Sequence, residues 1–141
     1  MQEGHVWNKR LDLDHDVLDG EHHLQIAMIG ALAEAIEQRR PSMARRLSEQ
    51  LETYSAAHFV GEELVMETSE YPRAAAHREE HQAILKHLGE LRERIRAEDH
   101  DEALAIALDL LTGISAHISS SDHAFAKHAS ERRGGGPLRQ R

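Results

Sequence analysis

Histidine and acidic residues recur in this sequence at spacings that could bind a metal ion. The stretch HFVGEELVM places His58 and Glu62 four residues apart, and HREEH gives His77 and His81 the same spacing. Residues four apart in a helix lie one above the other on the same face. Each pair would therefore point in one direction and could chelate one ion.

Two further segments add candidates to these pairs. DGEHHL offers His22 or His23, and HISSSD carries His117 and Asp122, which are five residues apart. Five residues of regular α-helix turn through about 500°, so the last two side chains should diverge by about 140°. That pair could not chelate a single ion, but it could reach two ions side by side.

The joint pattern is more informative than any one histidine. A lone histidine on an apolar face is more often a hydrogen-bonded core residue than a ligand, but several buried ionisable groups are costly unless they are paired or bind metal. Five imidazoles and two carboxylates form a nitrogen and oxygen set that suits iron, manganese or zinc. Seven ligands are too many for one octahedral ion. They predict two ions that share both carboxylates and a bridging oxygen, with one coordination position open.

The apolar residues between these motifs predict the elements that must position them. Spacings of three and four residues indicate helices over about 21–38, 43–68, 73–97 and 101–127, with Pro41 and Pro72 in two of the links and Ser42 as a helix cap. We therefore expect an all-α fold, an up-down-up-down antiparallel four-helix bundle over residues 1–128. The first twenty residues, with Trp7, should form an N-terminal arm, and residues 129–141 a disordered basic tail.

Composition excludes several classes of function. The chain has 141 residues and no cysteine, so it can form neither a disulfide nor a thiolate metal site. Its formal net charge of −8 argues against general affinity for nucleic acid or anionic membranes. No secretory leader or membrane-spanning run is evident, so we expect a cytoplasmic protein without membrane insertion. Glu-x-x-His, a motif of ferritin-like dimetal bundles, does not occur in the sequence.

The four histidine motifs, in this order and at helix-length separations, resemble the hemerythrin family and in particular its single-domain bacterial members. The resemblance covers about residues 7–125, from Trp7 and the LDGEH segment to HISSSD. It implies two iron ions with an oxo or hydroxo bridge, and O2 bound as hydroperoxide at an open iron position. It also implies the following iron ligands: His22, His58, Glu62, His77, His81, His117 and Asp122.

In the resemblance, Glu62 and Asp122 are the bridging carboxylates, and His22 and His58 flank the open position. The spacing from Trp7 and Asp19 favours His22 over His23. Glu63, Glu79 and Glu80 are expected to face solvent or to support the ligands. The remaining histidines fall outside the pattern and are expected at the surface: His5, His15, His87, His100, His123 and His128.

Two residues near the expected oxygen pocket depart from the family pattern. Gln25 stands where the family commonly has leucine, and Gly113 where it tends to have tryptophan. Apolar walls are still expected from Ile26, Phe59, Ile114 and Ile118. An amide could reach the open iron, and a lost indole leaves a cavity or a passage. Alternatively, Gln25 turns to solvent and neighbouring side chains refill the space.

These features favour a non-haem di-iron protein that stores, delivers or senses oxygen, with O2 as its ligand. A redox partner or an oxygen-consuming enzyme would be its protein partner. The alternative is a di-iron oxidase or peroxidase, in which Gln25 orients bound peroxide and the space at Gly113 admits a substrate. An iron store fits less well, because a fixed cage of seven ligands holds only two ions.

Overall fold

The computed structural model describes residues 16–134, including the side chains of residues 19–131, and everything below refers to these residues. Its elements are all helical and follow one another with short links. They are α1 (Asp16–Glu37), α2 (Pro41–Thr68), α3 (Ala74–Arg96), α4 (His100–His117), the π-helical turn η3 (Ile118–Asp122) and α5 (His123–Gly134).

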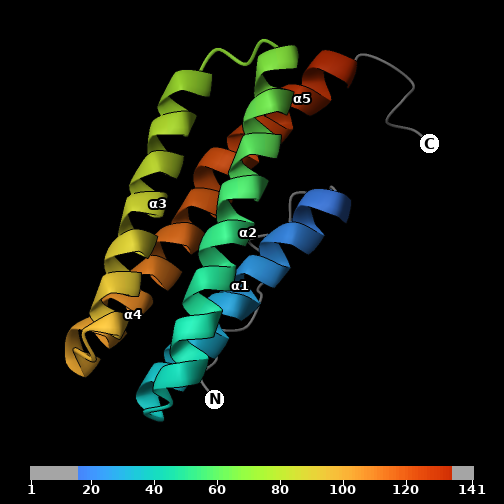
Figure 1. The fold of residues 1–141 in the computed structure, drawn as a ribbon. Coiled ribbons are helices and arrows are strands. Elements are labelled where there is room, and N and C mark those ends of the chain that lie inside the picture. Colours follow the sequence, from blue (N-terminus) through green and yellow to red (C-terminus); the bar gives the residue numbers. More distant parts are fainter. Residues whose placement is uncertain (1–15, 135–141) are drawn as a thin grey trace.

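The helices form a four-helix bundle in which consecutive helices run in opposite directions (Figure 1). Helix α1 packs on α2 and α4, and α3 packs on the same two helices from the other side. α4, η3 and α5 follow one another as a single long helix that forms the fourth member of the bundle (Figure 1). The predicted all-α bundle with up-down-up-down order is therefore confirmed.

Several predicted boundaries move when compared with the structure. α1 begins at Asp16, so the last residues of the expected N-terminal arm are helical, whereas Trp7 and the rest of that arm lie outside the described residues. α5 continues to Gly134, beyond the boundary that we placed after residue 128. Ser42 is not a helix cap, because Arg40 takes that position and Pro41 begins the helix, where its missing N–H costs nothing.

The apolar core lies mainly in one half of the bundle. All four long helices contribute fully buried side chains to it, among them Ile29, Leu32, Leu51, Leu88, Leu91 and Leu110. A second, smaller cluster of Met66, Tyr71 and Phe125 lies between the end of α2 and α5. The segment between these two apolar clusters carries the buried polar residues described in the next subsection.

Three helices end in the same way, with a residue other than glycine in the left-handed backbone region. Arg39, Glu70 and Glu98 have φ values of 57°, 56° and 57° after α1, α2 and α3. In each case the residue that follows donates its amide to a carbonyl five residues earlier, as in Tyr71 to Met66 at 2.9 Å. This is the Schellman motif, in which the left-handed position usually carries glycine.

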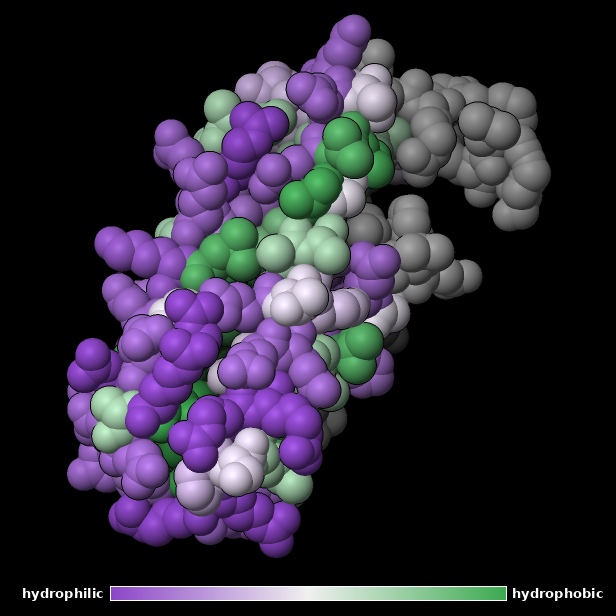
Figure 2. Space-filling model, in the orientation of Figure 1, coloured by the Kyte–Doolittle hydropathy of each residue, from purple (hydrophilic) through white to green (hydrophobic). Residues whose placement is uncertain are grey.

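The surface is predominantly hydrophilic, with small separate apolar patches on the face shown in Figure 2. The exposed large apolar side chains of the described residues include Val60, Leu64 and Val65 on α2.

The helical run His100–Glu131 is long and apolar enough to cross a membrane by composition, so our prediction of no such stretch was too strict. Part of its most apolar window, 39 %, is nevertheless buried inside the bundle. Core helices of soluble proteins meet the same criterion, and this helix packs against both α1 and α3.

Candidate metal centre

The seven residues predicted as metal ligands are all buried in the bundle interior. Each of the following seven residues is at most 6 % exposed: His22, His58, Glu62, His77, His81, His117 and Asp122. α1 contributes one of them and α2 and α3 two each, while His117 is the last residue of α4 and Asp122 the last residue of η3. The site therefore exists only when all four helices of the bundle are packed together.

The two carboxylates lie between two groups of histidines. Glu62 turns Oε2 toward His22 and His58, whose Nε2 atoms lie 3.0 and 3.1 Å away. Its other oxygen, Oε1, faces His81 and His77 at 3.1 and 3.7 Å. One carboxylate thus presents one oxygen atom to each group of imidazoles.

Asp122 repeats this arrangement from the opposite helix. Its Oδ2 lies 3.1 Å from Nε2 of His22, and its Oδ1 lies 2.8 and 3.1 Å from Nε2 of His77 and His117. The ligand atoms form two sets whose members lie within 4.8 Å of one another. The sets are Glu62, His77, His81, His117 and Asp122, and His22, His58 and Glu62.

The hydrogen bonding of these atoms fits a metal centre. Nε2 of His58, His77, His81 and His117 is buried without a hydrogen-bond partner, as are Oε1 of Glu62 and Oδ1 of Asp122. The atoms are close to one another but are not aligned as donors and acceptors. Buried polar atoms that stay unpaired are costly, and metal ligation removes that cost. The nitrogen and oxygen set suits iron.

Three histidines are held from behind by carboxylates through their Nδ1 atoms. Nδ1 of His58 lies 2.5 Å from Glu21, that of His81 lies 2.8 Å from Glu63, and that of His117 lies 2.7 Å from Glu80. Ser121 also donates to Glu80, at 2.7 Å. A partner on Nδ1 fixes the tautomer that leaves Nε2 free for a metal and makes the imidazole more basic.

Only part of this supporting layer was evident from the sequence. The supporting positions of Glu63 and Glu80 fit the expectation for them, and Glu79 is exposed. The role of Glu21 was missed, although it directly precedes His22. Its partner His58 lies 37 residues away, and only the packing of α1 on α2 brings the two together.

The charges of the metal-free site compensate one another. Burial raises the pKa of the Glu62 carboxyl, but the four histidines around it outweigh burial and hold that pKa far below its usual range. Burial lowers the pKa of His22 and His77, but the nearby Asp122 and Glu62 reverse this and raise both pKa values to about 9. Without metal, protons on the imidazoles balance the buried carboxylates. These are the protons that a metal ion would replace.

The predicted divergence of the His117 and Asp122 side chains was wrong, because a π-helical turn separates the two residues. The amide of His123 donates to the carbonyl of Ile118, five residues earlier, which widens the helix at this point. Residues five apart in a π-turn lie above one another much as residues four apart do in an α-helix. The two side chains therefore share a face, with Nε2 of His117 3.1 Å from Asp122.

Gln25 is buried and does not turn to solvent. It is 1 % exposed, one helical turn after His22, and its amide nitrogen donates to the hydroxyl of Ser55 at 2.9 Å. Ser55 is itself fully buried, one turn before His58. The two residues form a polar pair directly beside the histidines that flank the expected open position.

The apolar residues expected around the pocket are buried, namely Ile26, Phe59, Ile114 and Ile118. Phe59 stacks on the ring of His81, with centroids 4.0 Å apart and an interplanar angle of 10°. Gly113, unlike these four residues, is not buried. It is exposed in a groove of about 550 Å³ between α3 and α4, whose lining includes Ile114 and His117. A Cβ atom at this glycine would meet nothing within 4 Å.

Most of the other described histidines lie at the surface, as expected, and two are only partly exposed. His23, His87 and His123 are exposed, whereas His5 and His15 lie outside the described residues. His100 is half-buried at the end of the bundle, and His128 is half-buried with its ring 5.0 Å from that of Tyr71. Those last two are therefore not simple surface residues.

Comparison with known proteins agrees with the site. Residues 13–129 match the family model described as the hemerythrin HHE cation binding domain. A bacteriohemerythrin of Stenotrophomonas maltophilia is 31 % identical over 86 % of this chain and 78 % of its own length. Bacteriohemerythrins of Pseudomonas paraeruginosa and Pseudomonas aeruginosa are 29 % identical over 65 % of this chain and 60 % of theirs. The match spans all seven buried ligand candidates, and the chain belongs to the hemerythrin family.

Proposed function

We propose that the seven buried residues hold two iron ions and that the chain binds O2 reversibly at the ion beside His22 and His58. The observation that carries this proposal is the placement of the two carboxylates. Glu62 and Asp122 each turn one oxygen toward each group of histidines, as bridging ligands of two neighbouring ions would.

The division of the histidines supports the place of oxygen binding. Three histidines surround one end of the carboxylate pair and two surround the other, so the second ion has fewer protein ligands. A pair of ferrous ions supplies the two electrons that reversible oxygen binding requires. The surrounding protein contributes the buried walls, including Ile26 one turn from His22, that keep water away.

A di-iron oxidase or peroxidase is the second candidate, and the polar pair Gln25 and Ser55 favours it. A buried amide beside an oxygen site can donate a hydrogen bond and retain water, and both effects shorten the life of an oxygen adduct. The groove at Gly113 would give a small substrate access as far as His117. In either case we infer a cytoplasmic protein that receives electrons from a redox partner.

Visible absorption of the iron-loaded protein tests both candidates. The protein is reduced without oxygen, exposed to air and followed with time, and iron per chain is determined in parallel. A charge-transfer band that persists and disappears on deoxygenation supports reversible binding. A fleeting band, with continued oxygen consumption when a reductant is present, supports the enzyme. Fewer than two irons per chain contradicts both.

A further inference from the structure

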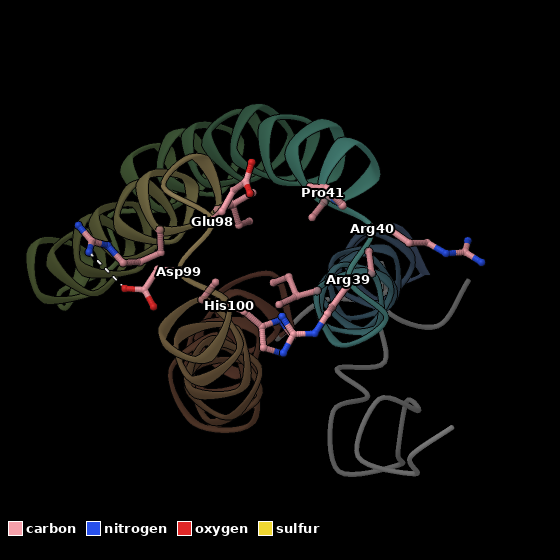
Figure 3. Close-up of a pocket in the computed structure, with 12 residues that line it drawn as sticks. Arg39, Arg40, Pro41, Glu98, Asp99 and His100 are labelled. Atoms are coloured by element: carbon pink, nitrogen blue, oxygen red, sulfur yellow. Dashed lines mark ion pairs between the residues drawn. The ribbon is translucent and has the colours of Figure 1, made fainter.

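A second cavity lies at the end of the bundle opposite the metal centre. It has a volume of about 260 Å³ and opens where α1 passes into α2 and α3 into α4 (Figure 3). Ala44 lines it, and Glu62 lies 18 residues further along the same helix. At 1.5 Å per residue the two sites are about 27 Å apart. This cavity is therefore not part of the metal centre.

The buried part of the cavity lining is apolar, whereas most of the other lining residues are charged or polar. Its buried lining residues are at most 5 % exposed and come from all four helices: Ala35, Ile36, Ala44, Ile95 and Ala103. The pocket is open to solvent at its charged rim. Its volume of about 260 Å³ has room for an aromatic ring with a short side arm.

The rim of the cavity carries a cationic group without an acidic partner. Arg94 is paired with Asp99 at 3.7 Å, but Arg39 makes no ion pair with any described residue. In Figure 3 the side chain of Arg39 reaches across the opening toward the ring of His100, whereas Arg40 points away. A guanidinium and an imidazole N–H both donate hydrogen bonds, so an anion between them would have partners on two sides.

The end of α1 fixes the backbone of Arg39, whose side chain is exposed. Its φ of 57° is set by the end of α1, where the amides of Arg39 and Arg40 donate to Ile36 and Ala35 at 3.0 and 2.9 Å.

The acidic residues on the rim limit the charge of the ligand. Glu98 and Asp99 line the same opening, and in Figure 3 Glu98 lies on the side away from Arg39. Their carboxylates would repel a ligand that carries several negative charges. A single negative charge, placed at the Arg39 side, would meet the cation without approaching Glu98.

We propose that this cavity binds a small monocarboxylate, with its apolar body among the buried alanines and isoleucines and its carboxylate between Arg39 and His100. The proposal is independent of the metal centre. A ligand of this size, with about eleven non-hydrogen atoms, should bind with a Kd of about 0.1–1 mM.

The test uses the iron-loaded full chain and 3-phenylpropionate as the probe. Amide resonances are followed by NMR during the titration, since the cavity is too far from the iron for strong paramagnetic broadening. We expect saturable shifts centred on Ala44, Ile95 and Ala103. Arg39→Gln should weaken binding about tenfold, the effect of losing one charge-assisted hydrogen bond. Ala103→Leu, which fills the cavity, should abolish it.

Three controls make the proposal falsifiable. 3-Phenylpropan-1-ol has the same apolar body without the charge and should bind at least tenfold more weakly, and inorganic phosphate should cause no saturable shift at these amides. Arg46→Gln removes an exposed arginine of α2 outside the cavity and should leave the Kd unchanged. Equal affinity for the alcohol, an equal effect of the two arginine variants, or shifts spread over the surface would each overturn the proposal.

Discussion

At the scale of single residues, Glu62 connects the two groups of histidines more directly than any other side chain. Four imidazoles lie within 3.7 Å of its two oxygens. We expect Glu62→Ala to abolish binding of two metal ions, because the ion beside His22 and His58 would keep only Asp122 as a carboxylate ligand. Iron per chain, measured by mass spectrometry, should fall below two. Glu79→Ala on the exposed face of α3 is the control and should retain both ions. A Glu62→Ala chain that still holds two irons would refute the site.

The carboxylates behind the histidines should affect affinity without removing a ligand. The carboxylate of Glu63 accepts a hydrogen bond from Nδ1 of His81 at 2.8 Å. Its replacement by alanine should weaken iron binding by about 10–100-fold, the usual effect of losing such a partner. Competition with a chelator measures the affinity, and Glu67→Ala, exposed one turn later on α2, provides the comparison. Equal affinities in both variants would show that Glu63 does not support His81.

We expect the hydrogen-bonded pair of Gln25 and Ser55 to shorten the life of an oxygen adduct. Changing Gln25 alone would leave the buried hydroxyl of Ser55 without its partner, so both residues are replaced together. In Gln25→Leu/Ser55→Ala the oxygenated form should persist several-fold longer than in the parent chain. Its decay is followed by visible absorption at constant temperature. An unchanged decay rate would remove the polar pair from the mechanism.

At the scale of the elements, periodicity predicted most of what the structure contains. Four apolar stripes and two prolines were sufficient for the helices and their order, and the i,i+4 histidine motifs pointed inward as expected. The π-turn was not predictable, because Ile118–Asp122 reads as ordinary helix when taken as local sequence. The prediction assumed a regular α-helix and therefore placed His117 and Asp122 on different faces. In the structure the widened turn brings the two side chains together.

Glycine in place of a left-handed residue at a helix end should stabilise the fold. Glu98 adopts a left-handed conformation with φ 57°, which strains any residue that has a Cβ atom. Glu98→Gly should stabilise the fold by about 0.5–1 kcal/mol and raise Tm by about 2–4 °C. Glu98→Ala retains the Cβ and should show no such gain in a thermal melt followed by circular dichroism. A loss of stability in the glycine variant would contradict the proposed strain.

At the scale of the whole molecule, the polar centre and the apolar core occupy different segments of the bundle. The large apolar cluster contains Leu32, Leu51 and Leu91 and should remain folded without metal. Removing iron should lower Tm by about 5 °C or more, because bound metal stabilises the native state. The chain should nevertheless remain folded at room temperature, because the apolar cluster does not depend on the metal.

Hydrogen exchange should locate this effect. In the metal-free protein, amides of α2 and α3 near His58 and His77 should lose protection, whereas those near Leu51 and Leu91 should keep it. The iron-loaded chain under the same conditions is the reference. Uniform loss of protection along each helix would show that the two segments are not separable.

The position of Asp122 also has a consequence for how the protein is made. The ligand candidates begin at His22 and end at Asp122, 100 residues later and close to the end of the described helix. While the chain is being synthesised from its N-terminus, Asp122 is added after all the other ligand candidates. The complete centre therefore cannot be assembled on the growing chain until the fourth helix of the bundle has emerged, because an intermediate that contains only α1, α2 and α3 lacks both His117 and Asp122.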